Sequence, residues 1–179
     1  ILEANTVEIV VAENRVVPAT VVAYDYDTGF GLLHPLAPLG VAAIELGQSS
    51  ALEVGSEILI AGLGVPAAAH IVSRRTFAGY WEYLLEDAIF TAPPYQNFAG
   101  AALIGPEGRL LGVGSLQVRD AAGAGHPMHG NMFVPIDALS PILGELIREG
   151  RSAASARPWL GVFSREIRGH LFVDSVSEG

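Results

Sequence analysis

Short apolar runs separated by turn-forming residues make up most of this chain. Glycine, proline, asparagine or aspartate divides the runs at intervals of roughly 8–12 residues, the spacing typical of an all-β sandwich or barrel. The pattern therefore predicts an all-β fold. The nine predicted strands are Val7–Val11, Val16–Tyr24, Phe30–Leu33, Glu57–Leu63, Ile71–Thr76, Tyr80–Thr91, Ala101–Ile104, Arg109–Gln117 and Met132–Ile136.

Two segments give more local predictions. Between Ile104 and Leu110 we expect one hairpin, with Pro106 at the first corner of its turn and Gly108 at the position that needs a positive φ. A single helix is expected near the end of the barrel sequence, with Asp137 or Ser140 as its cap and Gly150 just beyond its C-terminus. Its apolar face comprises Ile136, Leu139, Leu143, Leu146 and Ile147.

The small and polar segment Arg151–Ala156 reads as a linker. We therefore predict one domain over residues 1–156 and the start of another over 157–179, because 23 residues are too few to fold alone. Ile1 is not a start methionine, and the last residues read as a strand entering a turn. We expect an internal segment of a longer protein.

Composition narrows the function classes. Half of the 179 residues are hydrophobic and only 16% are charged, which excludes a disordered polar chain. The net charge of −9 argues against nucleic acid as a partner, because such binding rests on basic contacts to phosphate. With no cysteine, the chain has no disulfide, no thiolate metal site and no cysteine nucleophile.

No cofactor or metal is predicted. The glycine pairs Gly62–Gly64 and Gly112–Gly114 complete neither a dinucleotide nor a nucleotide-phosphate pattern, so they read as turns. His126 and His129 stand close together in a Gly/Ala-rich loop, but no carboxylate lies beside them. An exposed loop is the simpler interpretation of that pair.

Five segments follow one another along nearly the whole chain: Val21–Leu33, Leu52–Gly62, Asn97–Leu103, Phe133–Asp137 and Arg157–Val162. Together, in this order, they resemble the HtrA (DegP/DegQ-like) family of trypsin-fold serine proteases. Val21–Leu33 is similar to that family's Val-Val-Gly-x-Asp-x-x-Thr-Asp-Leu-Ala-Val-Leu, and Leu52–Gly62 to its Leu-x-Val-Gly-Asp-x-Val-x-Ala-Ile-Gly. Asn97–Leu103 stands where the family has Gly-Asn-Ser-Gly-Gly-Pro-Leu. Phe133–Asp137 and Arg157–Val162 resemble the family's Phe-Ala-Ile-Pro-Ile-Asp and its junction with a PDZ domain.

The resemblance implies a trypsin-like double β-barrel that lacks its first strands here, with one C-terminal helix, followed by the start of a PDZ domain. It also exposes departures at the positions that carry catalysis. Ala99 replaces the nucleophilic serine, and Gly29 replaces the triad aspartate. The family's histidine position lies upstream of Ile1. A methyl group cannot attack a carbonyl, and glycine cannot orient an imidazole.

The remaining site positions also come from the resemblance. The oxyanion hole would use the N–H groups of Asn97 and Ala99, and Asn97 stands where the family has glycine. A bound peptide would lie along Gly114, Ser115, Leu116 and Gln117, with Phe98 expected to fill part of the primary pocket. We further expect the Ala121–Gly130 loop to fold over this edge.

The leading hypothesis is a proteolytically inactive HtrA-like protein that binds polypeptide or unfolded protein, as a chaperone or as the regulator of an active protease partner. The resemblance implies the bacterial periplasm or envelope, with a membrane anchor upstream of this sequence and a homotrimer as further expectations. The alternatives are an HtrA-type serine endopeptidase carrying inactivating substitutions, and an assembly subunit that binds no peptide. Several independent departures favour natural degeneration over an engineered Ala99.

Overall fold

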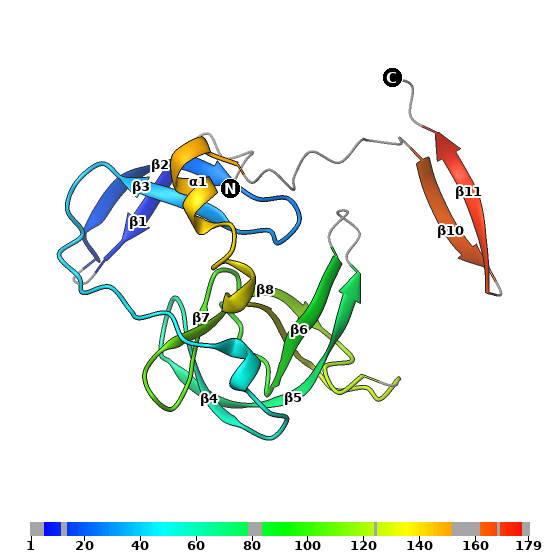
Figure 1. Cartoon of the computed structure of the whole chain (residues 1–179). Coiled ribbons are helices and arrows are strands. Elements are labelled where there is room, and N and C mark those ends of the chain that lie inside the picture. Colours follow the sequence, from blue (N-terminus) through cyan, green and yellow to red (C-terminus); the bar gives the residue numbers. More distant parts are fainter. Residues whose placement is uncertain are drawn as a thin grey trace.

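The computed structural model describes residues 6–11, 14–78, 84–123, 125–151, 162–167 and 169–176. The first strands form a three-stranded antiparallel sheet in the order β1-β2-β3. Its strands are β1 (Val7–Val10), β2 (Val16–Tyr24) and β3 (Gly31–Pro35). Figure 1 shows this sheet, in blue, beside the helix and apart from the barrel below it.

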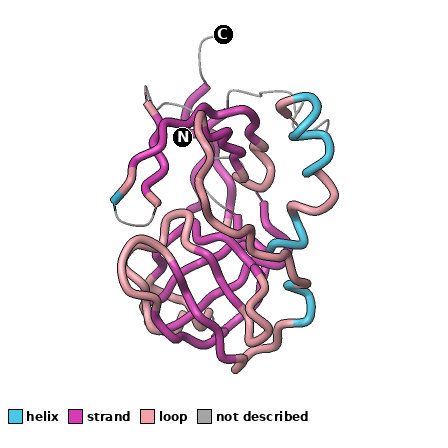
Figure 2. Tube along the Cα trace, turned by 90° about the vertical axis from the view of Figure 1, so that its left-hand side faces the viewer, coloured by secondary structure: helices cyan, strands magenta, loops and turns pink. Residues whose placement is uncertain are grey.

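The next six strands close into an antiparallel barrel in the order β4-β5-β6-β9-β8-β7. Figure 2 shows the barrel as the crossed magenta strands in the lower part of the molecule. Their bounds are β4 (Glu57–Ala61), β5 (Ala67–Ala78), β6 (Leu84–Ala92), β7 (Ala102–Ile104), β8 (Leu110–Val118) and β9 (Gly130–Pro135). The all-β prediction is confirmed, and the described strand boundaries differ from the predicted ones by only a few residues. Residues 80–83, at the start of the predicted strand Tyr80–Thr91, lie outside the described residues.

Two apolar clusters explain why β6 and β9 are apolar on both faces. All six barrel strands contribute to the first cluster, which is therefore the barrel interior and includes Ile89 and Phe133. The neighbouring residues Phe90 and Met132 point the other way, because side chains alternate along a strand, and they join a second cluster that contains Phe30 from the connection between β2 and β3. The second cluster thus packs the β2–β3 connection against the outside of the barrel.

The predicted hairpin and helix are both present. In the hairpin, Gly108 has φ +75°, and its N–H donates to the carbonyl of Gly105 at 2.9 Å. Helix α1 is shorter than its apolar pattern, covering Leu143–Glu149, and it ends at Gly150 in the left-handed region. Residues Ile136–Ala138 form a separate 3-10 turn, η3.

Neither predicted cap lies at the start of α1, so that part of the prediction was wrong. The residue before the helix is Ile142, and no side chain caps it. Asp137 instead accepts hydrogen bonds from the backbone N–H groups of Ser49 and Ser50, 2.9 and 2.8 Å away. Asp137 therefore stabilises the distant 3-10 turn η2 (Ser49–Ala51) rather than its own helix.

At the C-terminal end, β10 (Val162–Ile167) and β11 (His170–Val176) form an antiparallel hairpin whose described residues are all exposed. The predicted linker and the start of the predicted second domain fall on 152–161, outside the described residues. The domain boundary therefore stays a prediction. Among the helices described here, none has the length and hydropathy to cross a membrane.

Candidate functional site

The predicted nucleophile position, Ala99, lies on the turn between β6 and β7, residues 95–101, which we call the nucleophile turn. Ala99 is exposed at its tip. Two backbone hydrogen bonds join the turn to Gly114 of β8. The Gly100 N–H donates to Gly114 O, and the Gly114 N–H donates to Ala101 O, each at 2.8 Å. Within the turn, the Ala101 N–H donates to Phe98 O at 2.9 Å. These hydrogen bonds hold the backbone on both sides of Ala99.

Gly114 is the residue that lets the turn approach β8. A Cβ built on Gly114 would lie 2.0 Å from the carbonyl oxygen of Phe98, far inside van der Waals contact. Because the obstacle is backbone, it could not move aside without displacing the turn. The sequence alone did not indicate this requirement for glycine, because Gly112 and Gly114 read there only as part of a turn.

A buried clamp that sequence reasoning missed supports the start of the turn. The side chain of Asn131, in β9, is fully buried. Its Oδ1 accepts from the Tyr95 N–H at 2.6 Å, and its Nδ2 donates to Tyr95 O at 3.2 Å. The one available signal was a lone asparagine within a strand that is otherwise apolar or glycine.

The β4–β5 connection supports the turn from the other side. The side chain of Asn97 and the hydroxyl of Tyr95 both donate to the carbonyl of Leu63. Gly62 packs so closely that a Cβ there would lie 2.8 Å from Asn97 O. The resemblance places a glycine at the position of Asn97. The Asn97 side chain here joins the nucleophile turn to the β4–β5 connection, which is a structural role.

The predicted triad-aspartate position, Gly29, lies in the turn between β2 and β3. Asp25 organises this turn: its carboxylate accepts from the Thr28 N–H at 2.9 Å and from the Thr28 hydroxyl at 2.6 Å. Gly29 itself has φ +77°, and nothing lies within 4 Å of where its Cβ would stand. The backbone here has a conformation that an L-residue such as aspartate adopts only at a cost.

Both predicted oxyanion-hole residues are exposed. Within the part of the chain that the structure describes, no acceptor bonds the N–H of Asn97 or of Ala99. Phe98, between them, is half-buried and belongs to neither apolar cluster. Its predicted occupation of the primary pocket stays a prediction.

The predicted peptide edge, Gly114 to Gln117, lies in β8, which is hydrogen-bonded to β9 along one side. On the other side β7 pairs with β8 only as far as Val113, and the nucleophile turn then takes both backbone groups of Gly114. Among the described strands, none pairs with that side of β8 beyond Gly114. An added peptide strand could therefore begin only after Gly114, next to the turn that carries Ala99.

The Ala121–Gly130 loop, of which residue 124 is not described, is anchored toward β5. The hydroxyl of Ser73 and the guanidinium of Arg75 both donate to Ala121 O, at 2.6 and 3.0 Å. Arg75 also stacks over the ring of Phe90, 3.6 Å from its centroid. His126 and His129 are exposed, and the described residues contain no group of three side chains that could hold a metal.

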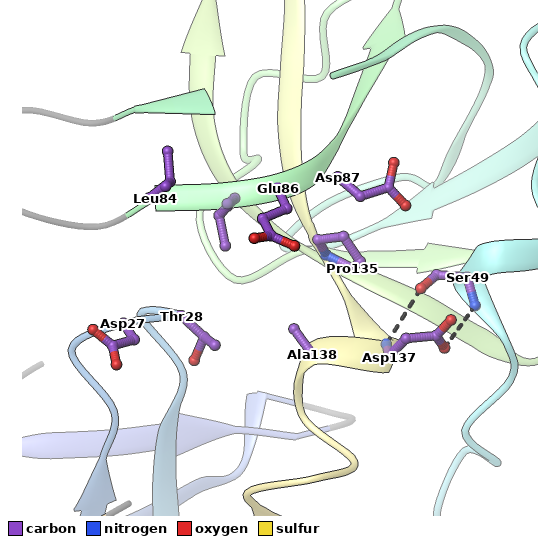
Figure 3. Close-up of a pocket in the computed structure, with 10 residues that line it drawn as sticks. Asp27, Thr28, Ser49, Leu84, Glu86, Asp87, Pro135, Asp137 and Ala138 are labelled. Carbon is purple, nitrogen blue, oxygen red and sulfur yellow. Dashed lines mark hydrogen bonds between the residues drawn. The ribbon is translucent and has the colours of Figure 1, made fainter. Parts of the chain in front are cut away.

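A hollow of about 280 Å³ lies between the β2–β3 turn and the ends of β6 and β9, but it does not include the nucleophile turn. Figure 3 shows carboxylates from three elements around it, with Asp137 bonded to Ser49. Burial raises the pKa of Asp137, but the hydrogen bonds from Ser50 and Ser49 outweigh burial and hold the pKa below its usual value. This Asp137 carboxylate is therefore a structural anion and not an acid–base candidate.

Comparison with known proteins gives two curated relatives. The chain is 26% identical over 183 residues to the serine protease PepD of Mycobacterium tuberculosis (strain ATCC 25618 / H37Rv). The matched region covers 94% of this chain and 39% of that protein. The chain is 25% identical over 173 residues to the serine protease Do-like HtrA of Lactobacillus helveticus, covering 89% of this chain and 40% of the relative. The chain thus spans about two fifths of the length of these relatives. No protein-family model matches it.

Solved structures agree on the fold. The HtrA-type protease AlgW with a decapeptide matches with a TM-score of 0.68 at 21% identity, covering 97% of this chain and 57% of that one. AlgW with a tripeptide matches with a TM-score of 0.65 at 20% identity, covering 98% of this chain and 62% of that one. The trypsin-like fold predicted from the sequence is therefore confirmed.

Proposed function

We propose that this chain, an HtrA-like protein with the fold of the HtrA-type serine proteases, is a proteolytically inactive member that binds polypeptide. The observation that carries the proposal is Ala99 on a nucleophile turn whose backbone is still hydrogen-bonded to β8. Removing a serine nucleophile typically costs about 10⁶ in turnover rate. The turn offers backbone donors but no group that can form an acyl-enzyme.

The aspartate position gives independent support for natural degeneration. A single inactivating change made on purpose would leave the rest of the triad and its backbone in place. Here Gly29 occupies the left-handed region, where glycine carries no steric penalty. The β2–β3 turn therefore fits its present glycine, and Ala99 is one of several changes at this site.

Peptide binding does not depend on the triad. In β-augmentation, main-chain hydrogen bonds at an exposed strand edge supply affinity. Leu116 and Gln117, on the side of β8 with which no described strand pairs, supply such an edge near the nucleophile turn. AlgW, which has the same fold, is described with a decapeptide and with a tripeptide. Without a deep anchor pocket, we expect micromolar or weaker affinity for extended apolar peptides.

The biological setting follows from the same proposal. A polypeptide binder of this type would act in the bacterial periplasm or envelope, as a holder of unfolded chains or as the regulator of an active protease partner. Trimer formation and a membrane anchor upstream of Ile1 belong to the proposal as well. They call for the full-length protein, tested by sedimentation and by membrane fractionation.

One assay on denatured casein tests both halves of the proposal. We expect no cleavage and no serine labelled by a fluorophosphonate, together with slower aggregation of the casein. Stoichiometric labelling of any serine would refute inactivity. Failure to delay aggregation or to bind extended peptides would refute the binding role and leave the assembly-subunit alternative.

A matched pair of variants assigns binding to the nucleophile turn. Ala99→Trp places a large ring at an exposed position beside the β8 edge, whereas Ala78→Trp places it at an exposed position at the end of β5. We expect peptide affinity to fall at least tenfold in the first variant and to stay unchanged in the second. Equal affinities in both variants would show that the peptide binds elsewhere.

The competing hypothesis is an HtrA-type endopeptidase whose sequence carries inactivating substitutions. The backbone of the nucleophile turn, still bonded to Gly114 on β8 and to the side chain of Asn131, favours it. That framework would accept a restored serine. The restoration experiment in the Discussion separates the two hypotheses.

A further inference from the structure

The connection from β3 to the barrel exposes an unusual apolar segment. Residues 40–46 are all exposed, and five of these seven residues are apolar: Val41, Ala42, Ala43, Ile44 and Leu46. The side chains of Val41, Ile44 and Leu46 remain 60%, 41% and 41% exposed. Figure 1 shows this segment in cyan, running from β3 toward the barrel. We call residues 40–46 the β3–β4 linker, or simply the linker, as distinct from the predicted linker at Arg151–Ala156.

The backbone groups of this segment also lack hydrogen-bond partners among the described residues. In the described part of the chain, no hydrogen bond uses the N–H or C=O groups of Val41 to Ile44. The next residues are fixed, because the Leu110 N–H donates to Glu45 O at 2.8 Å and the Gly47 N–H donates to Leu110 O at 2.9 Å. A free stretch of backbone therefore leads directly into one that is docked on β8.

The docked end opens into a groove of about 850 Å³, which we call the linker groove. Leu46, Ala51, Leu52, Pro106 and Leu111 give it an apolar lining. The volume is within the range of about 300–1,000 Å³ that ligand sites occupy. Glu57, at its rim, begins β4, whereas Gly62, which packs on the nucleophile turn, follows the end of β4. The linker groove and the nucleophile turn therefore lie at opposite ends of one strand.

Charge selects among possible occupants. The rim carries Glu57, Glu107 and the adjoining Glu45 against a single cation, Arg109. Arg109 already pairs with Glu45 at 3.4 Å and with Glu107 at 3.8 Å. The excess of carboxylate around an apolar floor complements a ligand that combines apolar and basic side chains. An anionic ligand would meet repulsion, in line with the net charge of −9.

We propose that the Val41–Ile44 backbone and the linker groove form a second polypeptide-binding surface, for an extended segment with alternating apolar and basic residues. Main-chain groups of the ligand pair with the free groups of the linker, as in β-augmentation. An apolar side chain enters the groove, and a lysine or arginine meets the Glu57–Glu107 rim. This surface is separate from the edge beside Ala99 and does not depend on the binding proposed there.

The test is fluorescence polarisation with a labelled ten-residue peptide that alternates valine and lysine, against a peptide with glutamate in place of lysine. Leu46→Ser removes an apolar contact from the groove, and Ala51→Trp fills it. Ile147→Ser is the matched control, because Ile147 is 69% exposed and lies in α1, outside both proposed binding sites. The double change Glu57→Gln with Glu107→Gln removes the rim charge. Circular dichroism melts show that each variant is folded.

We expect the lysine peptide to bind, the glutamate peptide to bind at least tenfold more weakly, and Leu46→Ser and Ala51→Trp to lower affinity about tenfold. The charge-neutral double variant should lose roughly two- to fivefold at low salt, and high salt should abolish this loss. Ile147→Ser should change nothing. Binding that survives Ala51→Trp but is lost in Ala99→Trp would overturn this proposal and support the edge beside Ala99. No difference between the two peptides, or no binding at millimolar concentration, would also overturn it.

Discussion

Restoring a serine at position 99 will not restore useful proteolysis. In serine proteases, a correctly placed nucleophile without an oriented histidine is weak. In trypsin, replacing the triad aspartate by asparagine lowers turnover about 10⁴-fold. Gly29 stands at the position that the resemblance assigns to that aspartate, so we expect Ala99→Ser to stay at least about 10⁴ below an active homologue in turnover.

Adding Gly29→Asp introduces the missing carboxylate at a calculable cost. Nothing lies within 4 Å of the position that a Cβ would take, so the side chain meets no steric obstacle. The backbone, however, sits at φ +77°, where an L-residue costs about 1–2 kcal/mol. At roughly 2–4 °C per kcal/mol for a chain of this size, the melting temperature should fall by about 2–8 °C.

The assay combines turnover of a fluorogenic peptide, fluorophosphonate labelling and thermal melts on the Ala99→Ser, Gly29→Asp and double variants. Gly29→Ala is the control, because it carries the same backbone cost without a carboxylate and should melt within about 2 °C of Gly29→Asp. Turnover by Ala99→Ser near that of an active homologue would refute the argument from Gly29. An unchanged melting temperature in both Gly29 variants would show that the turn relaxes out of the left-handed region.

Three further changes test the framework. Gly114→Ala places a Cβ 2.0 Å from Phe98 O and should lower the free energy of unfolding in urea by about 1–3 kcal/mol; an unaffected midpoint would mean that the nucleophile turn is loosely held. Asp137→Asn should cost about 1–2 kcal/mol at pH 7. The folded-state pKa of Asp137 is lowered, so its contribution to stability is present above the unfolded pKa of about 3.9 and is lost as the pH falls through the folded pKa. The difference in unfolding free energy between variant and wild type should therefore narrow below about pH 4. A difference that stays constant with pH would contradict the role of the charge. Thr91→Val should stabilise the barrel by about 1 kcal/mol in the same titration, since the buried Thr91 hydroxyl has no hydrogen-bond partner within the described residues. A clear loss of stability would instead reveal a bound water there.

Local chemistry made much of the fold predictable from sequence. Strand periodicity and turn residues act within a few positions, so the runs of apolar residues located most strands, and Gly108 and Gly150 marked a hairpin turn and a helix end. The order of family-like segments also gave the trypsin-like fold. The prediction of a missing nucleophile also came from the sequence, because the resemblance places Ala99 at the serine position and alanine has no hydroxyl.

Other features were decided only by the tertiary structure, because their partners are far apart along the chain. Asp137 looked like the cap of the following helix, but the fold places it against Ser49, 88 residues away, and its carboxylate satisfies backbone donors there. The Asn131 clamp on Tyr95 spans 36 residues, and the need for glycine at Gly114 appears only when the nucleophile turn packs on β8. Sequence patterns report the conformation that each segment prefers. Which buried polar groups meet, and which backbones touch, follows from the closure of the barrel.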